Sequence, residues 1–425
     1  MKNFFSIKNF LPKNSIFFYI IFLFVFFLFS SIFILSLFKV VNMWSFSQAH
    51  MNYSYGFVKR GLFGTIMLFI ENFFLVSPRK FFSFFFIILT SINILLFFNI
   101  IKKYSANFLV FLFLALNPTL IIFSFNDLGG YQRFDAISIF AMLLHCLYAC
   151  NHNLKNDIVM YKKKLFFIIF PIILISSFIH EIIIWSLPLH VLITMNTTKE
   201  NFNRTIRYYL IFFLLFIVIF LFPVEDKTVQ KMISDLSERN LFIDAIIVVS
   251  AIKGNLQVLN YEIQTNLLNF YNFKINLFFI ILSTLPFLFF INYLQNNNYL
   301  DVKINPYHLI FATFPYLTLF AIGDTGRWIS LISFTSLTFM AQFPLKKNIE
   351  YFRISKKIFC QRLFTLIIFI TIFIYVFFIR MPHCCNLEKK GITIWGGISH
   401  KLYAFSRIIS KDQDDFYNLN KRFKE

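Results

Sequence analysis

Charged side chains are scarce in this chain, and their scarcity excludes most soluble folds. Only 14% of the residues are charged, whereas 58% are hydrophobic and the mean hydropathy is +0.69. Several apolar runs reach the roughly 20 residues that a helix needs to cross a bilayer. The sequence therefore predicts an all-α, polytopic membrane protein built as a transmembrane helical bundle.

The sequence also lacks a paired-cysteine motif, a regular repeat and a signal-peptide cleavage site. The five cysteines form no C-x-x-C pair, so neither a disulfide framework nor a zinc site is indicated. No fixed-period repeat is present. The first apolar run, residues 16–38, is too long for a signal-peptide core and lacks a small-x-small cleavage site. We therefore expect a retained first span with a cytoplasmic N-terminus.

The excess of positive charge indicates cytoplasmic loops of a membrane protein and not a binding surface for an acidic ligand. The net charge is +20, but the lysines and arginines fall mainly between apolar segments, where the positive-inside rule places them. The expected surroundings are membrane lipid, with no nucleic acid as a partner. The bacterial inner membrane is the expected location.

Charge placement predicts about eleven spans, with the N-terminus inside and the C-terminus outside. Residues 1–380 form the predicted membrane domain, which includes a long external loop at 223–274, and residues 381–425 form a polar tail. The spans expected after the first are 81–101, 106–125, 136–150, two short crossings within 165–194, 208–222, 275–294, 307–322, the run that follows Trp328, and 363–379. An apolar patch at 241–251 is expected to form an interfacial or re-entrant helix.

The run 62–76 is short and carries Glu71 and Asn72. If it crossed the bilayer, Lys162, Lys163 and Lys164 would lie outside, against the positive-inside rule. We therefore predict an amphipathic helix in the first external loop that lies along the outer interface.

This topology places four polar segments on the same outer face. They are residues 53–64, 126–135, 180–181 and 323–328. Ionisable residues near a membrane indicate a functional site by default. The candidates are Lys59, Arg60, Asp127, Arg133, Asp135, His180, Glu181, Asp324 and Arg327.

These residue types suit the transfer of a group from a lipid phosphate carrier. Lysine and arginine match phosphate oxygens, which assigns Lys59, Arg60, Arg133 and Arg327 to substrate phosphate. A carboxylate or histidine removes a proton from an acceptor hydroxyl. This assigns catalytic roles to Asp127, Asp135, His180, Glu181 and Asp324. A divalent cation between Asp127, Asp135 and Asp324 is a further alternative, although no specific ligand set is evident.

Each segment also has a purely structural interpretation. Lys59 and Arg60 could anchor lipid headgroups, and Asp127 and Asp135 could cap the next helix and pair with Arg133. His180 and Glu181 could form a satisfied turn pair. Asp324 and Arg327 could form a local salt bridge within a tight turn.

The four segments together resemble polytopic proteins encoded with bacterial surface-polysaccharide genes. The quoted motifs are G-F-V-K-R-G-L-F-G at 56–64, N-P at 117–118, D-x-G-G-Y-x-R-x-D at 127–135, H-E at 180–181 and G-D-T-G-R-W at 323–328. More loosely, they resemble GT-C glycosyltransferases and the related O-antigen and capsule polymerases. The resemblance implies undecaprenyl-phosphate-linked sugars as substrate. It also implies an interfacial helix such as 62–76.

One feature departs from the GT-C pattern. Those enzymes usually carry an acidic residue in the first external loop, whereas residues 39–60 contain none and offer only His50 as a base, with Glu71 further on. This absence favours Asp127, Asp135 or Glu181 as the catalytic carboxylate.

The leading hypothesis is therefore a polymerase or transferase of O-antigen or capsule assembly that acts at the external face. The chief alternative is a lipid-linked glycan flippase or transporter. A third is a non-catalytic scaffold for other polysaccharide-assembly proteins.

Overall fold

A computed structural model describes most of residues 19–345. The described residues are 19–27, 30, 43–58, 60–104, 108–125, 132–155, 157–221, 224–239, 305–319, 325–343 and 345, with scattered positions between 274 and 295. Within them the regular secondary structure is helical, with no strand. The all-α prediction is confirmed.

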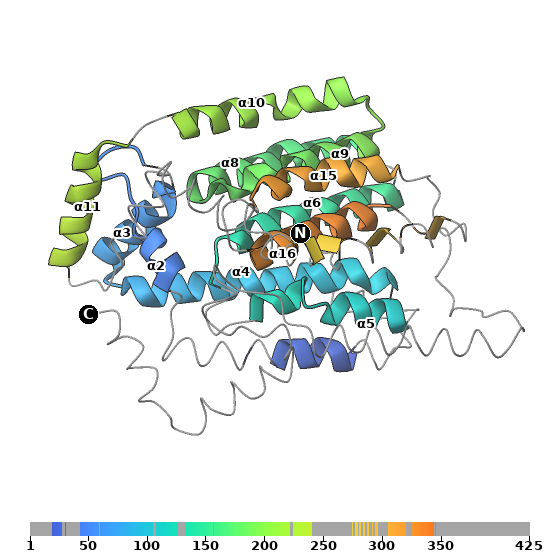
Figure 1. Cartoon of the computed structure of the whole chain (residues 1–425), viewed down its shortest axis with the longest axis horizontal. Helices are drawn as coiled ribbons and strands as arrows, with labels where there is room; N and C mark the ends of the chain where they lie inside the picture. The colour runs from blue at the N-terminus through green and yellow to red at the C-terminus, as the bar shows by residue number, and fades with distance from the viewer. Residues whose placement is uncertain are drawn as a thin grey trace, which may run out of the picture.

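Seven helices run side by side and form an elongated bundle (Figure 1). They are α4 (Pro78–Ile101), α6 (Asp135–Lys155), α8 (Phe170–Ile179), α9 (Leu187–Thr198), α10 (Phe202–Leu221), α15 (Pro306–Thr318) and α16 (Thr325–Ala341). The central helix is α6, which packs against α4, α9 and α16. Because the chain reverses between successive helices, the described loops gather at two opposite ends.

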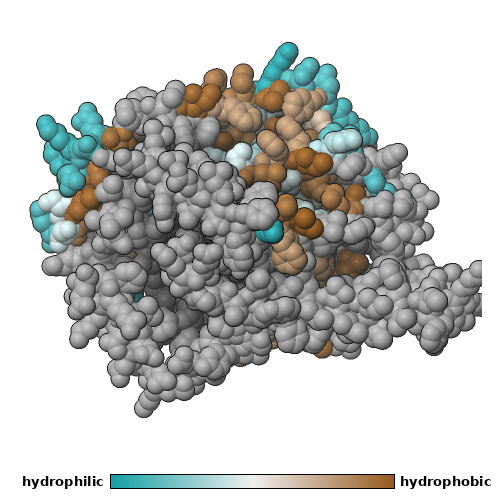
Figure 2. Space-filling model, in the orientation of Figure 1, coloured by the Kyte–Doolittle hydropathy of each residue, from teal (hydrophilic) through white to brown (hydrophobic). Residues whose placement is uncertain are grey.

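An apolar surface lies between these two ends. Figure 2 shows hydrophobic side chains over the middle of the visible described surface, with hydrophilic ones toward its left and right limits. On α10 this surface includes the exposed side chains of Leu210, Ile211, Leu214 and Ile217. An exposed apolar area of this kind is typical of a protein face that contacts lipid or another protein.

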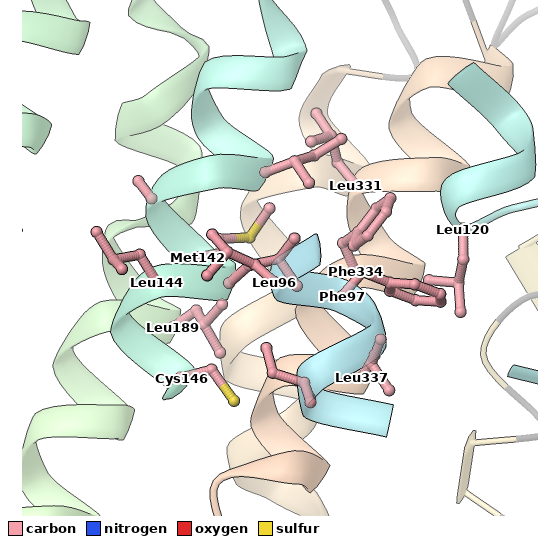
Figure 3. Close-up of a cluster of buried hydrophobic side chains, with 14 of the residues drawn as sticks. Leu96, Phe97, Leu120, Met142, Leu144, Cys146, Leu189, Leu331, Phe334 and Leu337 are labelled. Carbon is pink, nitrogen blue, oxygen red and sulfur yellow. The ribbon is translucent and has the colours of Figure 1, made fainter. Parts of the chain in front are cut away.

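The interior is filled by large aliphatic and aromatic side chains. In Figure 3, Phe97 of α4 and Phe334 of α16 lie beside each other, with Met142 of α6 nearby. The rings of Phe97 and Phe334 meet edge to face with centroids 6.1 Å apart. Such contacts fix the three helices against one another.

Three shorter helices, α2 (Met43–Ala49), α3 (Gly61–Phe74) and α11 (Asp226–Glu238), lie at one end of the bundle, at the left in Figure 1. One face of α11 buries Val229, Met232 and Leu236 in a small hydrophobic cluster that also contains Met51 and Val58. Arg239 forms an ion pair with Glu71 of α3. We call this the α3 end.

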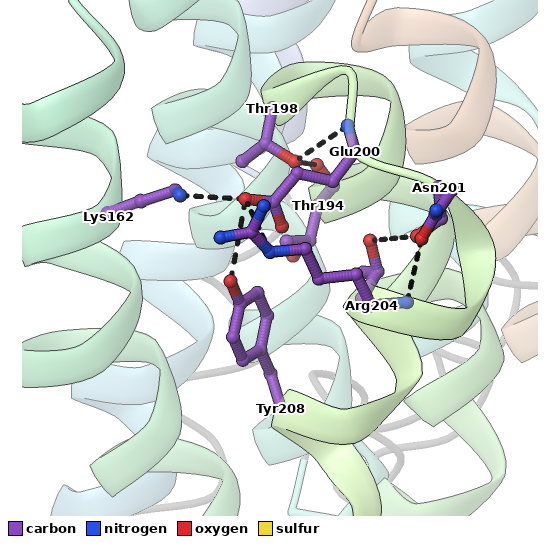
Figure 4. A network of polar contacts seen from close by, with 8 residues as sticks. Lys162, Thr194, Thr198, Glu200, Asn201, Arg204 and Tyr208 are labelled. Atoms are coloured by element: carbon purple, nitrogen blue, oxygen red, sulfur yellow. Dashed lines mark hydrogen bonds and ion pairs between the residues drawn. The ribbon is translucent and has the colours of Figure 1, made fainter.

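The opposite end carries a basic network, shown in Figure 4. Lys162 Nζ lies 2.8 Å from Glu200 Oε1, and Arg204 Nε lies 3.7 Å from the same oxygen. The Tyr208 hydroxyl donates to this oxygen at 3.4 Å. We call this the basic end.

A ring of buried polar side chains links α6, α9, α10 and α7 (Ile158–Lys164). His145 Nδ1 lies 2.8 Å from His190 Nδ1, and His145 Nε2 lies 2.8 Å from the Tyr161 hydroxyl. Tyr161 donates to Thr194 Oγ1 at 3.3 Å, and Thr194 Oγ1 lies 2.8 Å from the Tyr209 hydroxyl. Tyr209 donates to the His190 carbonyl at 3.1 Å. Hydrogen bonds between helices hold an apolar bundle together.

Two helices differ in extent from the spans predicted there. Residues 106–125 are not one helix: α5 (Phe108–Leu116) stops before Asn117-Pro118, and a 3-10 turn (Ile121–Phe125) follows. Asn117 Oδ1 accepts from the Thr119 backbone N–H at 2.9 Å, which replaces helical bonding there. The helix that contains the first of the two crossings predicted within 165–194 begins at Ile158, before the apolar run, and continues through a π turn (Leu165–Ile169) into α8. Lysines are good helix formers, so the charge run does not mark its start.

One helix in the described part of the chain, Pro78–Tyr104, is 27 residues long and apolar enough to cross a membrane. The count of about eleven spans stays a prediction. The structure describes only part of the predicted spans at 275–294 and 307–322. The described residues of the first span, and those of the second up to residue 318, are helical. The predicted span at 363–379, the patch at 241–251 and the tail lie outside the described residues, as does most of the first span.

Candidate functional site

The site at the α3 end is built around the turn that begins α6. Phe134 is buried, and its ring meets Phe63 and Phe86 at centroid distances of 5.4 and 5.3 Å. The His180 ring centre lies 5.8 Å from that of Phe134. This aromatic packing fixes the two polar neighbours of Phe134, Arg133 and Asp135, at the mouth of the bundle.

Asp135 is the first residue of α6 and is 6% exposed. Arg327, near the start of α16, donates to both of its carboxylate oxygens, from Nε at 2.6 Å and from Nη2 at 2.7 Å. Such a two-point contact is the strongest geometry for an arginine and a carboxylate. The helix N-terminus adds a favourable interaction with the negative charge.

His180 and Glu181 lie where the chain reverses between α8 and α9. α8 ends at Ile179, His180 is extended, and a 3-10 helix (Glu181–Ser186) follows. His180 Nδ1 accepts a hydrogen bond from the Ile182 backbone N–H at 3.2 Å. This bond leaves the proton of the neutral ring on Nε2.

Glu181 is paired with Arg60, which immediately precedes α3. Arg60 Nε donates to Glu181 Oε2 at 2.7 Å, and Arg60 Nη2 donates to Oε1. Both side chains are about one-sixth exposed, at 15% and 16%. Arg60 has a left-handed backbone conformation with φ 61°. That conformation is uncommon outside glycine and fixes the direction in which Arg60 leaves the turn.

Gly64 allows the segment that contains Met51 to lie close against α3. A Cβ at this position would overlap the Met51 carbonyl oxygen. The segment that follows α2 therefore crosses directly over the first turn of α3. This crossing brings Arg60 to the mouth of the bundle.

The two ion pairs surround His180. Burial lowers the pKa of His180 to about 3, and Arg60 adds to the effect. Burial alone would raise the pKa of Asp135 and of Glu181, but Arg327 and Arg60 outweigh it and hold both pKa values below their ordinary range. The site therefore contains two carboxylates, two paired guanidinium groups and a neutral imidazole at pH 7.

The structure brings together candidates that lie far apart in the sequence. These are Arg60, Arg133, Asp135, His180, Glu181 and Arg327. Their roles in chemistry stay predictions. Lys59, Asp127 and Asp324 lie outside the described residues.

The expected local pairing of Asp135 with Arg133 is replaced by a distant pairing with Arg327. Arg133 is a nearby positive charge that helps to lower the pKa of the Asp135 carboxylate. Arg327 is fixed at the start of α16, where its guanidinium also lies 5.0 Å from the Trp328 ring centre. Asp135 therefore pairs with an arginine of a neighbouring helix that can contact both of its oxygens, although another arginine lies two residues away in the sequence.

Sequence reasoning missed several residues around the site. It did not anticipate the ion pair of Glu71 with Arg239 or the aromatic contacts of Phe134. It also gave no role to the buried polar residues of α4, including Ser83, whose hydroxyl accepts from Gln132 Nε2 at 3.4 Å. Polar residues spaced along an apolar helix were the available signal.

The donor set does not define a metal centre. Among the described residues, no group of three or more histidine, cysteine, aspartate or glutamate side chains could hold a metal ion. Arg327 already contacts both oxygens of Asp135. The cation expected between Asp127, Asp135 and Asp324 is therefore supported by no described contact.

Comparison with known proteins gives no match: no family profile, no curated protein sequence and no solved structure matches the chain.

Proposed function

We propose that the chain is a membrane-embedded glycosyl-transferring enzyme of surface-polysaccharide assembly. Its donor would be a sugar linked to a polyprenyl phosphate, and its site would face the outside of the bacterial inner membrane. One observation carries this proposal: two arginine–carboxylate pairs enclose a neutral histidine at one end of an apolar helical bundle. The resemblance of the four polar segments to polysaccharide polymerases and GT-C enzymes agrees with it.

The distribution of charge supports a bilayer around the bundle. Lys102, Lys103, Lys155, Lys162, Lys199 and Arg204 lie at helix ends away from the site. The positive-inside rule would place that end in the cytoplasm and the α3 end outside. The apolar surface between the ends would then contact lipid (Figure 2).

Arg60 is the group best suited to a substrate phosphate. A guanidinium has five N–H donors, and Glu181 engages Nε and Nη2. The side chain stays 15% exposed at the mouth of the bundle. A phosphate could therefore share Arg60 with Glu181, which would stabilise the negative charge that builds up on the leaving phosphate.

The two carboxylates fit a role in orientation better than one in strong base catalysis. Their lowered pKa values keep them ionised at neutral pH and make them weak bases. They can accept a hydrogen bond from an acceptor hydroxyl and stabilise positive charge on the sugar ring as its bond to phosphate breaks. His180 would act as a hydrogen-bond donor through Nε2, because Nδ1 is already bonded to the Ile182 N–H.

The test is glycan analysis in cells that lack the gene and are then supplied with wild type or Glu181→Gln. The matched control is Glu238→Gln, which changes an exposed glutamate on α11. Long surface chains should be lost on deletion and restored by wild type and Glu238→Gln. They should not be restored by Glu181→Gln at equal protein level.

Two results would overturn the proposal. Normal chains with Glu181→Gln would remove the pair from the chemistry. Complete lipid-linked units that accumulate on the inner leaflet after deletion would identify a flippase instead.

A further inference from the structure

Contacts along α4, α6 and α16 set which residues share a level in the bundle. Asp135 pairs with Arg327, and Met142 Sδ accepts from Thr335 Oγ1 at 3.5 Å. α6 and α16 therefore run parallel with a constant offset. The Phe97–Phe334 contact sets the register between α4 and α16, and Figure 3 shows both rings in the shared core.

This register places polar side chains directly beneath the Asp135–Arg327 pair. Ser138 follows Asp135 by three residues on α6, and Ser330 follows Arg327 by three residues on α16. Each serine therefore lies on the same face of its helix as the charged residue, about one turn deeper in the bundle. Asn93 precedes Phe97 by the same four residues by which Ser330 precedes Phe334. Asn93, Ser138 and Ser330 therefore lie at one level on three helices.

These side chains are buried and incompletely bonded. Asn93 is 3% exposed and Ser330 is 2% exposed. Asn93 Nδ2 donates to the Ala136 carbonyl at 2.8 Å, which fixes the orientation of the amide. Within the described part of the chain, neither Asn93 Oδ1 nor Ser330 Oγ has a hydrogen-bond partner, and the same is true of Thr90 Oγ1, one turn nearer the α3 end.

Unpaired polar atoms at such depth call for a physical reason. An unbonded polar group in the interior is less stable than a bonded one, and buried polar groups in proteins are nearly always paired. Three of them here lie on α4 and α16, close to the level of the Asp135–Arg327 pair. A ligand held beside the Asp135–Arg327 pair could supply the missing hydrogen bonds.

The chemistry of these atoms selects hydroxyl groups. Asn93 Oδ1 only accepts hydrogen bonds, whereas the hydroxyls of Thr90 and Ser330 donate and accept. No cation lies at this level on the three helices, so a phosphate would find its partners higher, at the arginines. We propose that Thr90, Asn93 and Ser330 form a subsite for the hydroxyl groups of the transferred sugar. This inference rests on the proposed function and adds where the sugar lies.

The test measures binding of carrier lipids to the whole protein in nanodiscs. The probes are undecaprenyl phosphate and undecaprenyl phosphate linked to glucose, galactose or N-acetylglucosamine. Wild type should bind at least one glycosylated carrier about tenfold more tightly than the bare carrier, as expected for one or two added hydrogen bonds. The variant Asn93→Leu with Ser330→Ala should lose that preference and keep its affinity for the bare carrier.

Ser336→Ala is the matched control, because Ser336 is buried on the same helix but already donates to the Ile332 carbonyl at 2.8 Å. It should keep the sugar preference. Equal binding of bare and glycosylated carriers by wild type would overturn the subsite while leaving the proposed function intact. A preference that survives in the Asn93 and Ser330 variant would likewise overturn the subsite, and failure to bind any carrier would overturn the proposed function itself.

Discussion

At the scale of single residues, the site depends on charges whose partners come from distant parts of the chain. Arg60 meets Glu181, and Arg327 meets Asp135. A buried ion pair contributes little net stability when intact, but it is costly to break because one charge stays buried alone. Stability measurements on single and double variants can therefore reveal the pairing without knowledge of the substrate.

Arg327→Gln should lower the free energy of unfolding by about 3–5 kcal/mol, because Asp135 would remain buried without its partner. Adding Asp135→Asn should restore part of this loss, since the double variant carries no unpaired charge. The measurement is the unfolding temperature in detergent, followed by tryptophan fluorescence. Additive losses in the double variant would contradict the pairing.

Acid should destabilise the protein, and His180 should contribute a defined share. Its pKa is about 3 in the folded chain and 6.5 ordinarily. Between pH 6 and pH 5 the unfolded chain takes up this proton while the folded chain does not. The free energy of unfolding should therefore fall by about 1.4 kcal/mol per pH unit from this residue.

Unfolding temperatures of wild type and His180→Gln across that pH range test this share. The variant should show the shallower dependence. His50→Gln is an informative comparison, because burial lowers the pKa of His50 to about 4 and its removal should flatten the curve independently. Parallel curves for wild type and His180→Gln would show that the His180 ring is protonated in the folded state.

At the scale of elements, helices were more predictable than their ends. The pattern of apolar runs predicted α4, α6, α10, α15 and the helix at α3, because lipid-length apolar segments favour helix strongly. The break at Asn117-Pro118 and the start of the α7 helix at Ile158 were missed, because side-chain bonding and local propensity decide such boundaries. The turn at His180 was predicted correctly from the polar pair inside a long apolar run.

Gly64→Ala should separate α3 from the segment after α2, since the added methyl group would overlap the Met51 carbonyl oxygen. We expect a lower unfolding temperature and loss of any activity that needs Arg60. Phe69→Ala, on the exposed side of the same helix at 52% exposure, is the control and should be mild. A native unfolding temperature for Gly64→Ala would show that the crossing adjusts freely.

At the scale of the whole molecule, the sequence predicted that the polar segments share one face, and the described candidates do meet at one end of the bundle. It could not predict which charged residues form ion pairs. Asp135, for example, has an arginine two residues away and yet bonds to Arg327. Such choices depend on helix register and direction. A single sequence records neither.

The proposed orientation in the bilayer can be tested by labelling single cysteines with a membrane-impermeant maleimide. Ser234→Cys, exposed on α11 at the α3 end, should react in intact spheroplasts. Lys163→Cys, at the basic end, should react only after permeabilisation. The reverse pattern would invert the topology and place the site in the cytoplasm.

The polar ring of His145, His190, Tyr161, Thr194 and Tyr209 limits how the molecule can move. Because Tyr209 gives its proton to the His190 carbonyl, Thr194 must donate to Tyr209, Tyr161 to Thr194, and His145 Nε2 to Tyr161. The ring thus closes in one direction only, and sliding or rotating α9 against α6 or α10 would break several bonds together. We therefore expect these helices to move as one block, so that an opening of the bundle would displace other helices relative to it.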